Sequence, residues 1–137
     1  HPVAHSFPTR RSSDLREGAI LPEHVADVDV GAAPRVLVRT RDENGTDFPE
    51  RFVSFSPEAA RALGDRGAVL LGLDTPSVDA VDSKDLPAHH TLLPTRTAIL
   101  ENLQLAHVDP GVYELIALPL RWTGLDASPV RAVLRTP

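Results

Sequence analysis

Two histidines and one glutamate are the residues of this 137-residue chain whose types and spacing best suit chemistry. His89 and His90 are adjacent, and Glu101 follows His89 by twelve residues, inside an apolar run. Neutral imidazole and carboxylate groups are ligands for first-row metals such as zinc and manganese. Two ligands are fewer than the three protein ligands that catalytic zinc sites usually have. The spacing leaves two interpretations open: a metal site, or a solvated histidine pair and a glutamate at a strand end that pairs with an arginine.

The segment before the histidine pair carries further polar residues. Asp74 and Ser77 directly follow an apolar run, and Lys84 is the only lysine of the chain. Ser77, Asp79 and His89 are the residue types of a nucleophilic triad, but their order along the chain does not establish a geometry. The chain has no G-x-S-x-G motif and no glycine-rich phosphate loop. An α/β-hydrolase serine and a nucleotide site are therefore not supported.

These residues need a scaffold, and the hydrophobic pattern predicts an α/β one. Residues 35–39 and 68–73 are short apolar runs typical of buried strands. Between them, Ser56-Pro57-Glu58 has the N-cap, the first-turn proline and the acid that begin a helix. A strand, a helix and a strand in this order favour a parallel pair. Residues 74–90 then form a polar loop beyond the carboxyl end of a strand, where open α/β sheets bind ligands.

The rest of the chain predicts more strands than helices. Strands are expected over residues 97–103, over residues 112–120 and at the end of residues 125–134, and a short helix near Pro22. In the first of these strands, a period of two places Glu101 on the face of Ile99 and Leu103, so we expect its carboxylate to point inward. A buried carboxylate is costly unless it is paired or bound to a metal. The predicted fold class is α/β with a mixed sheet.

Composition narrows the function classes. The chain is 42% apolar and 24% charged, with a formal charge of −5 and no cysteine. The acidic balance argues against a nucleic-acid partner, and no apolar run approaches the roughly 20 residues of a membrane helix. Without cysteine there is neither a disulfide framework nor a thiolate zinc site. We expect a cytoplasmic protein with no membrane partner.

Residues 1–15 differ from the remainder. They show no apolar period and no strand alternation, and residues 5–15 match, codon by codon, the translation of a common sequencing-library adaptor. Residues 1–4 fit the rest of such an adaptor. A disordered basic leader or a targeting peptide is the alternative, although no apolar stretch of a signal peptide follows Arg10-Arg11. We therefore expect residues 1–15 to be non-native and only residues 16–137 to belong to the native protein.

Five segments, taken in order, carry a family resemblance. They are residues 72–79 (GLDTPSVD), 82–90 (DSKDLPAHH), 98–101 (AILE), 113–120 (YELIALPL) and 126–134 (DASPVRAVL). Together they resemble the C-terminal part of the bacterial kynurenine formamidases, the arylformamidases of the metal-dependent cyclase superfamily. The serine-dependent formamidases of animals share none of these motifs.

The resemblance implies a swivelling β/β/α-type cyclase fold, a homodimer, and zinc-dependent hydrolysis of N-formyl-L-kynurenine to L-kynurenine and formate in tryptophan catabolism. In that family the first histidine of the pair and the glutamate of the AILE run are zinc ligands, and these fall on His89 and Glu101. Two zinc ions per intact site are implied. Asp74, Ser77 and Lys84 would line the site loop without a defined role, and His90 would lie behind the ligand or take no part.

The family's other ligands, a His-x-x-x-His-x-Asp motif, and its catalytic histidine lie in its N-terminal half. Residues 16–137 contain neither. We therefore expect these residues to be the C-terminal portion of a single domain, to have no catalytic residue of their own, to bind zinc weakly and not to hydrolyse formylkynurenine alone. Two alternatives stay open: a related cyclase-family amidohydrolase such as an isatin hydrolase, and a non-catalytic remnant.

Overall fold

The computed structural model describes residues 3–8 and 18–136, with side chains from residue 18 onward. Its strands are β1 (Val3–Pro8), β2 (Gly18–Ile20), β3 (Arg35–Arg39), β4 (Val53–Phe55), β5 (Leu70–Leu73), β6 (Ala98–Leu100), β7 (Gly111–Pro119) and β8 (Val130–Arg135). Its helices are the 3₁₀ turn η1 (Pro22–His24), α1 (Pro57–Asp65) and α2 (Pro87–Leu92). Within the described ranges, no helix is long and apolar enough to cross a membrane.

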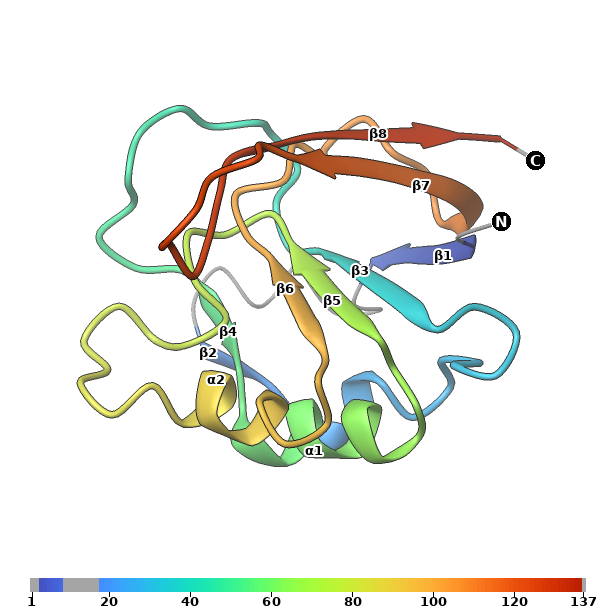
Figure 1. Cartoon of the computed structure of the whole chain (residues 1–137). Coiled ribbons are helices and arrows are strands. Elements are labelled where there is room, and N and C mark those ends of the chain that lie inside the picture. The colour runs from blue at the N-terminus through green and yellow to red at the C-terminus, as the bar shows by residue number, and fades with distance from the viewer. Residues whose placement is uncertain (1–2, 9–17, 137) are drawn as a thin grey trace.

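The strands form one large mixed sheet and one small one. The large sheet has six strands in the order β6-β5-β3-β1-β7-β8. Its first four strands are mutually parallel, whereas β7 runs antiparallel to both β1 and β8. The small sheet pairs β2 with β4 in parallel. Figure 1 shows α1 and α2 together on one side of β5 and β6, while the β7–β8 hairpin curls over the other side. The predicted mixed α/β fold is confirmed.

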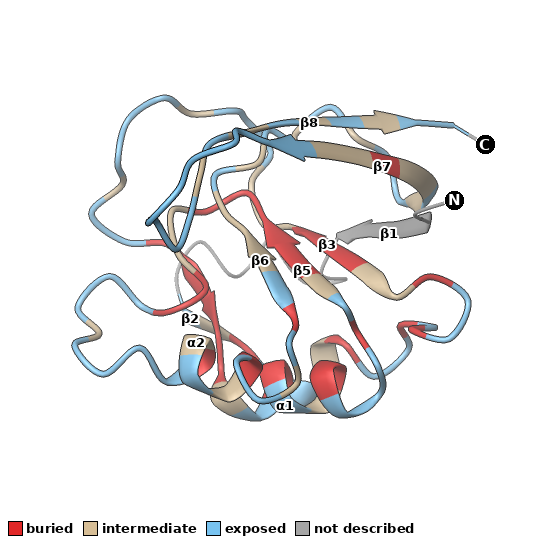
Figure 2. Ribbon diagram, viewed as in Figure 1, coloured by how far each residue is buried: buried red, intermediate tan, exposed pale blue. Residues whose placement is uncertain are grey.

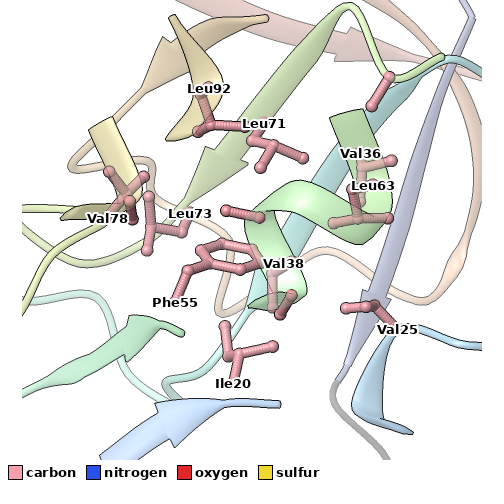
Figure 3. Close-up of a cluster of buried hydrophobic side chains, with 14 of the residues drawn as sticks. Ile20, Val25, Val36, Val38, Phe55, Leu63, Leu71, Leu73, Val78 and Leu92 are labelled. Atoms are coloured by element: carbon pink, nitrogen blue, oxygen red, sulfur yellow. The ribbon is translucent and has the colours of Figure 1, made fainter. Parts of the chain in front are cut away.

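The main core lies between the large sheet and the layer made of the two helices and the small sheet. Four fully buried side chains project into this core from β3 and β5 (Figure 3): Val36, Val38, Leu71 and Leu73. They meet the side chains of the opposite layer, Phe55, Ala59, Ala60, Leu63, Ala88 and Leu92 among them. Burial of one such leucine or valine contributes about 1.5–3 kcal/mol. Figure 2 shows the buried residues concentrated on these central elements.

Helix α1 forms for the local reasons visible in its sequence. The Ser56 hydroxyl accepts a hydrogen bond from the Ala59 N–H at 3.1 Å, and Pro57 occupies the first turn. The helix ends before Gly67, whose φ of +94° is a conformation that side-chain-bearing residues rarely adopt. The helix predicted from Ser56 is therefore confirmed, together with its cap.

A second, smaller core lies on the other face of the sheet. Leu37, Leu105 and Leu115 are buried there, under the curled hairpin. Gly72 in β5 lets this face close, because a Cβ at that position would stand 2.5 Å from Leu37 Cδ2 and 2.8 Å from Leu103 Cδ1. A side chain in the middle of β5 would push these two leucines apart.

The structure corrects four local expectations. Residues 87–90, predicted as loop, are the start of helix α2, and the strand expected over residues 97–103 is only Ala98–Leu100. Strands β2 and β4 were not predicted. Residues 3–8, for which no strand was expected, form β1 between β3 and β7. Strand pairing uses backbone groups, so a segment without hydrophobic alternation can fill that position. The proposed adaptor origin of residues 1–15 stays a prediction, and residues 9–15 lie outside the described part.

Candidate metal centre

The candidate centre begins with His89, in the first turns of α2. Its Nδ1 lies 2.7 Å from Oδ2 of Asp79, a carboxylate that is 2% exposed. The same carboxylate accepts the backbone N–H of Ala88 at 2.7 Å and the backbone N–H of His89 at 3.1 Å. Leu86, the N-cap residue of α2, makes no side-chain cap. Asp79 therefore both caps this helix from nine residues away and holds the imidazole ring.

Glu101 reaches the same point from the end of β6. It directly follows the last residue of that strand, and its Oε1 lies 3.4 Å from Nε2 of His89. Oε1 also accepts the backbone N–H of Val78 at 3.0 Å. The next residue, Asn102, has a φ of +59° and donates its N–H to the Thr75 carbonyl at 2.9 Å. The chain turns at Glu101, so its carboxylate faces the segment between β5 and α2.

Glu101 lies beside His89 as the metal-site prediction requires, but strand alternation is not the reason. The predicted alternation through Leu103 does not occur, because the strand ends at Leu100. The Glu101 side chain is 29% exposed and the His89 side chain 33% exposed, so the pair is open on one side. The carboxylate is directed by a turn and by a backbone N–H from another segment.

The donor pair suits a metal ion on two counts. A carboxylate is an acceptor only, so the contact with Asp79 requires the proton on Nδ1, and in the neutral ring this leaves the Nε2 lone pair free to ligate. Two ligands held at about 2.0–2.1 Å by a tetrahedral metal lie about 3.3–3.4 Å apart, which matches the separation of Nε2 and Oε1. An ion pair between a protonated His89 and Glu101 would have a similar distance.

The ligand set is incomplete in this part of the molecule. No group of three or more histidine, cysteine, aspartate or glutamate side chains that could hold a metal ion occurs among the described residues. His89 and Glu101 thus supply one side of a site. Their outer faces are partly exposed, where further ligands could approach.

Asp74 lies at the end of β5 with its carboxylate engaged elsewhere. It is 4% exposed and accepts hydrogen bonds from the Thr40 N–H and hydroxyl and from the Arg41 N–H, at 2.7–3.0 Å. Burial raises the pKa of the Asp74 carboxyl above its ordinary value, and these hydrogen bonds oppose that rise. Asp74 anchors the segment that follows β3 to the end of β5.

The other predicted loop residues, Ser77, Lys84 and His90, differ in their contacts and exposure. The Ser77 hydroxyl accepts the Asp79 N–H at 3.1 Å, so it supports the segment that carries Asp79. The described contacts therefore contain an Asp79–His89 pair but no serine nucleophile. Lys84 and His90 are exposed. The sequence did not predict that Asp79 orients His89. Its position ten residues before that histidine was the one indication of such a role.

A groove of about 970 Å³ borders the centre. It runs between the chain that follows β6 and the β7–β8 hairpin, and Glu101, Asn102, His107 and Tyr113 line it together with leucines of the second core. Glu101 is thus shared between the donor pair and a mostly apolar depression.

Comparison with known proteins identifies named relatives of this chain. The chain is 50% identical over 119 residues to the kynurenine formamidase of Salinibacter ruber, covering 85% of this chain and 56% of that protein. It is 49% identical over 117 residues to the kynurenine formamidase of Bordetella pertussis, with the same coverage. The chain is a homologue of the kynurenine formamidases. It spans about half the length of the curated relatives it matches. No family model matches it.

Solved structures agree with the kynurenine formamidase homology at the level of the fold. A predicted metal-dependent hydrolase from Bacillus stearothermophilus superposes with a TM-score of 0.82 at 26% identity, over 97% of this chain and 62% of that one. A potential metal-dependent hydrolase with cyclase activity gives the same score and identity, over 64% of its chain. An isatin hydrolase shares the fold alone, with a TM-score of 0.67 and 18% identity over 59% of its chain.

Proposed function

We propose that this chain forms part of a metal-dependent kynurenine formamidase, which hydrolyses N-formyl-L-kynurenine to L-kynurenine and formate. The observation that carries the proposal is the 50% identity to a kynurenine formamidase over 119 residues. The convergence of His89 Nε2 and Glu101 Oε1 at 3.4 Å supports the metal dependence. The isatin hydrolase likeness concerns the fold alone and does not favour that substrate.

In this proposal, His89 and Glu101 hold a divalent cation, zinc, of which the intact site binds two. When bound by these residues, zinc would supply Lewis-acid activation of water and of the formyl carbonyl. Hydrolysis then breaks the formyl C–N bond, adds water across it and leaves a proton on the arylamine. The chain contributes the neutral imidazole nitrogen and the negative charge of Glu101, which offsets part of the charge of the cation. A homodimer is part of the same proposal.

A chimera tests the function. Residues 18–136 replace the aligned segment of the Salinibacter ruber kynurenine formamidase, and kynurenine release is followed by absorbance with and without a chelator. We expect formylkynurenine hydrolysis that the chelator abolishes. His89→Ala in the chimera is expected to lower kcat/KM at least 100-fold, whereas Asp82→Asn, a change at an exposed acid, leaves it unchanged. A folded, metal-loaded chimera that hydrolyses no formylkynurenine would contradict the proposal.

A second candidate, a non-catalytic remnant, has one observation in its favour. Two metal donors, rather than a complete ligand set, come together in the described part of the chain. This candidate concerns the chain alone, so the isolated 137-residue chain and the chimera separate it from the first.

A further inference from the structure

Asp79 is the most highly connected acid of the candidate centre. Its side chain is 2% exposed, and its two oxygens accept from the Ala88 N–H, the His89 N–H and the His89 ring. A carboxylate buried to this extent is stable only when hydrogen bonds replace its hydration. All three of those hydrogen bonds come from the first turn of α2, the turn that carries the metal donor.

We propose that Asp79 is a positioning residue that holds His89 as the Nδ1–H tautomer and so keeps Nε2 available as a donor toward Glu101 and a metal ion. This inference rests on the proposed metal dependence for its purpose, but the tautomer is a property of the metal-free chain. The carboxylate, having no proton to give, requires the donor at Nδ1. The distance of 2.7 Å is short, as in charge-assisted hydrogen bonds.

The residue before Asp79 positions the other donor. The Val78 N–H donates to Oε1 of Glu101 at 3.0 Å, so the dipeptide Val78–Asp79 contacts both members of the pair. The dipeptide is itself fixed to the core: the Val78 side chain is fully buried, and its carbonyl accepts the Phe55 N–H at 2.7 Å. Two donors from α2 and from the end of β6 are thus aligned by one buried segment.

A purely structural role for Asp79, as a helix cap, makes a different prediction. Asp79→Asn keeps the amide oxygen as an acceptor for the Ala88 N–H, but its NH₂ group takes the place of the oxygen that accepts from the His89 N–H and the His89 ring. That NH₂ is a donor, so it selects the ring tautomer with Nδ1 unprotonated and Nε2 protonated. A protonated Nε2 cannot ligate a metal. The ring tautomer is therefore the measurement that distinguishes positioning of His89 from helix capping.

The experiment uses the full 137-residue chain without metal. Long-range ¹H–¹⁵N spectra of the histidine rings report the tautomer, with His89 assigned by its loss in His89→Gln. We expect Nδ1–H in the native chain and Nε2–H in Asp79→Asn. Zinc affinity, measured by competition with a chromogenic chelator, should fall roughly 10- to 100-fold in Asp79→Asn, the range for groups that orient metal ligands. Asp82→Asn, the same change at an exposed acid of the same loop, should alter neither quantity.

Two results would overturn the proposal. One is an Nε2–H tautomer of His89 in the native chain, which needs no variant to fold. The other is an Asp79→Asn chain with unchanged tautomer and zinc affinity whose melting temperature alone falls, because that is the behaviour of a helix cap. If the chimera needs no metal but the native chain shows the expected tautomer, the proposed metal dependence fails while the positioning role stands.

Discussion

At the scale of single residues, the centre consists of donors that are held by hydrogen bonds from a neighbouring segment. His89 is oriented by a buried carboxylate, and Glu101 by a backbone N–H. Both side chains are about one-third exposed, so neither is held in place by packing alone. The donor properties of the pair therefore depend on individual hydrogen bonds, and single substitutions should change metal binding more than folding.

His89→Ala and Glu101→Gln should each lower the zinc affinity of the chain at least 10-fold. His89→Ala removes a ligand, whereas Glu101→Gln keeps an acceptor for the Val78 N–H but loses the negative charge that attracts the cation. Competition titration with a chromogenic chelator measures the affinity, and circular dichroism checks that both variants remain folded. An unchanged affinity in either variant would remove that residue from the ligand set.

Asp74 should make stability depend on pH. Because burial raises its pKa in the folded state, folding favours the protonated carboxyl. The resulting contribution to stability is present below the pKa of the unfolded chain and is lost as pH rises through the raised folded pKa. We expect the unfolding free energy of the native chain, relative to Asp74→Asn, to fall between pH 4 and pH 7. Urea titrations at both pH values measure this difference, and a difference that rises with pH would contradict the assignment.

At the scale of elements, α1 and the strands β3 and β5 carry local signals, whereas α2 depends on a contact from outside the helix. Helix α1 carries its own cap in Ser56. Helix α2 has six residues and begins after Leu86, which adopts a φ of +45° and provides no side-chain cap. A non-glycine residue in this conformation costs about 1–2 kcal/mol, which the Asp79 cap and the burial of Ala88 and Leu92 offset.

Ser56→Ala should destabilise the chain by about 1 kcal/mol, because the Ala59 N–H loses its side-chain acceptor inside the protein. Ser128→Ala is the matched control, since the Ser128 hydroxyl contacts only its neighbour Pro129 at an exposed position in the described contacts. Urea unfolding followed by circular dichroism gives both values. Equal effects of the two substitutions would show that the hydroxyl of Ser56 does not cap α1.

Gly72→Ala should destabilise the chain by about 1–3 kcal/mol through overpacking. The added Cβ would stand 2.5 Å from Leu37 Cδ2 and 2.8 Å from Leu103 Cδ1, closer than carbon atoms pack. Leu103 follows Glu101 by two residues, so the displacement should also weaken zinc binding. Gly31→Ala is the control, because its new Cβ meets only the Asp29 side chain at 3.4 Å. A Gly72→Ala chain as stable as the native one would show that the two leucines yield without cost.

At the scale of the whole molecule, the described chain has a well-buried core on one side of the large sheet and a less covered side that carries the candidate centre. The core between the sheet and the helices is well buried, yet Leu118, Trp122 and Leu125 near the hairpin are more than half exposed. The donor pair and the groove lie on this less covered side, and the chain spans 56% of the kynurenine formamidases it matches.

The isolated chain should therefore release no kynurenine from N-formyl-L-kynurenine above the uncatalysed rate, while the chimera described above is active. Two protein donors bind a metal more weakly than the three or more of a catalytic zinc site. Kynurenine absorbance, with and without added zinc, measures the outcome. Turnover by the isolated chain that a chelator abolishes would show that residues of this chain complete the site unaided.

The sequence by itself determined the elements whose signals lie within a few residues. The apolar runs of β3 and β5, the Ser56 cap of α1 and the parallel order of these strands were all predicted, as were the donor types at His89 and Glu101. Such features depend on periodicity and capping, which are local properties of the chain.

Only the tertiary structure decided how the donors are aimed. Helix α2, the turn at Glu101 and the place of β1 in the sheet depend on partners far along the chain: the Asp79 carboxylate, the Val78 N–H, and the edges of β3 and β7. These contacts form through single hydrogen bonds or backbone pairing, which leave no hydrophobic period in the sequence. The sequence could therefore nominate His89 and Glu101, but not the buried dipeptide that brings them together.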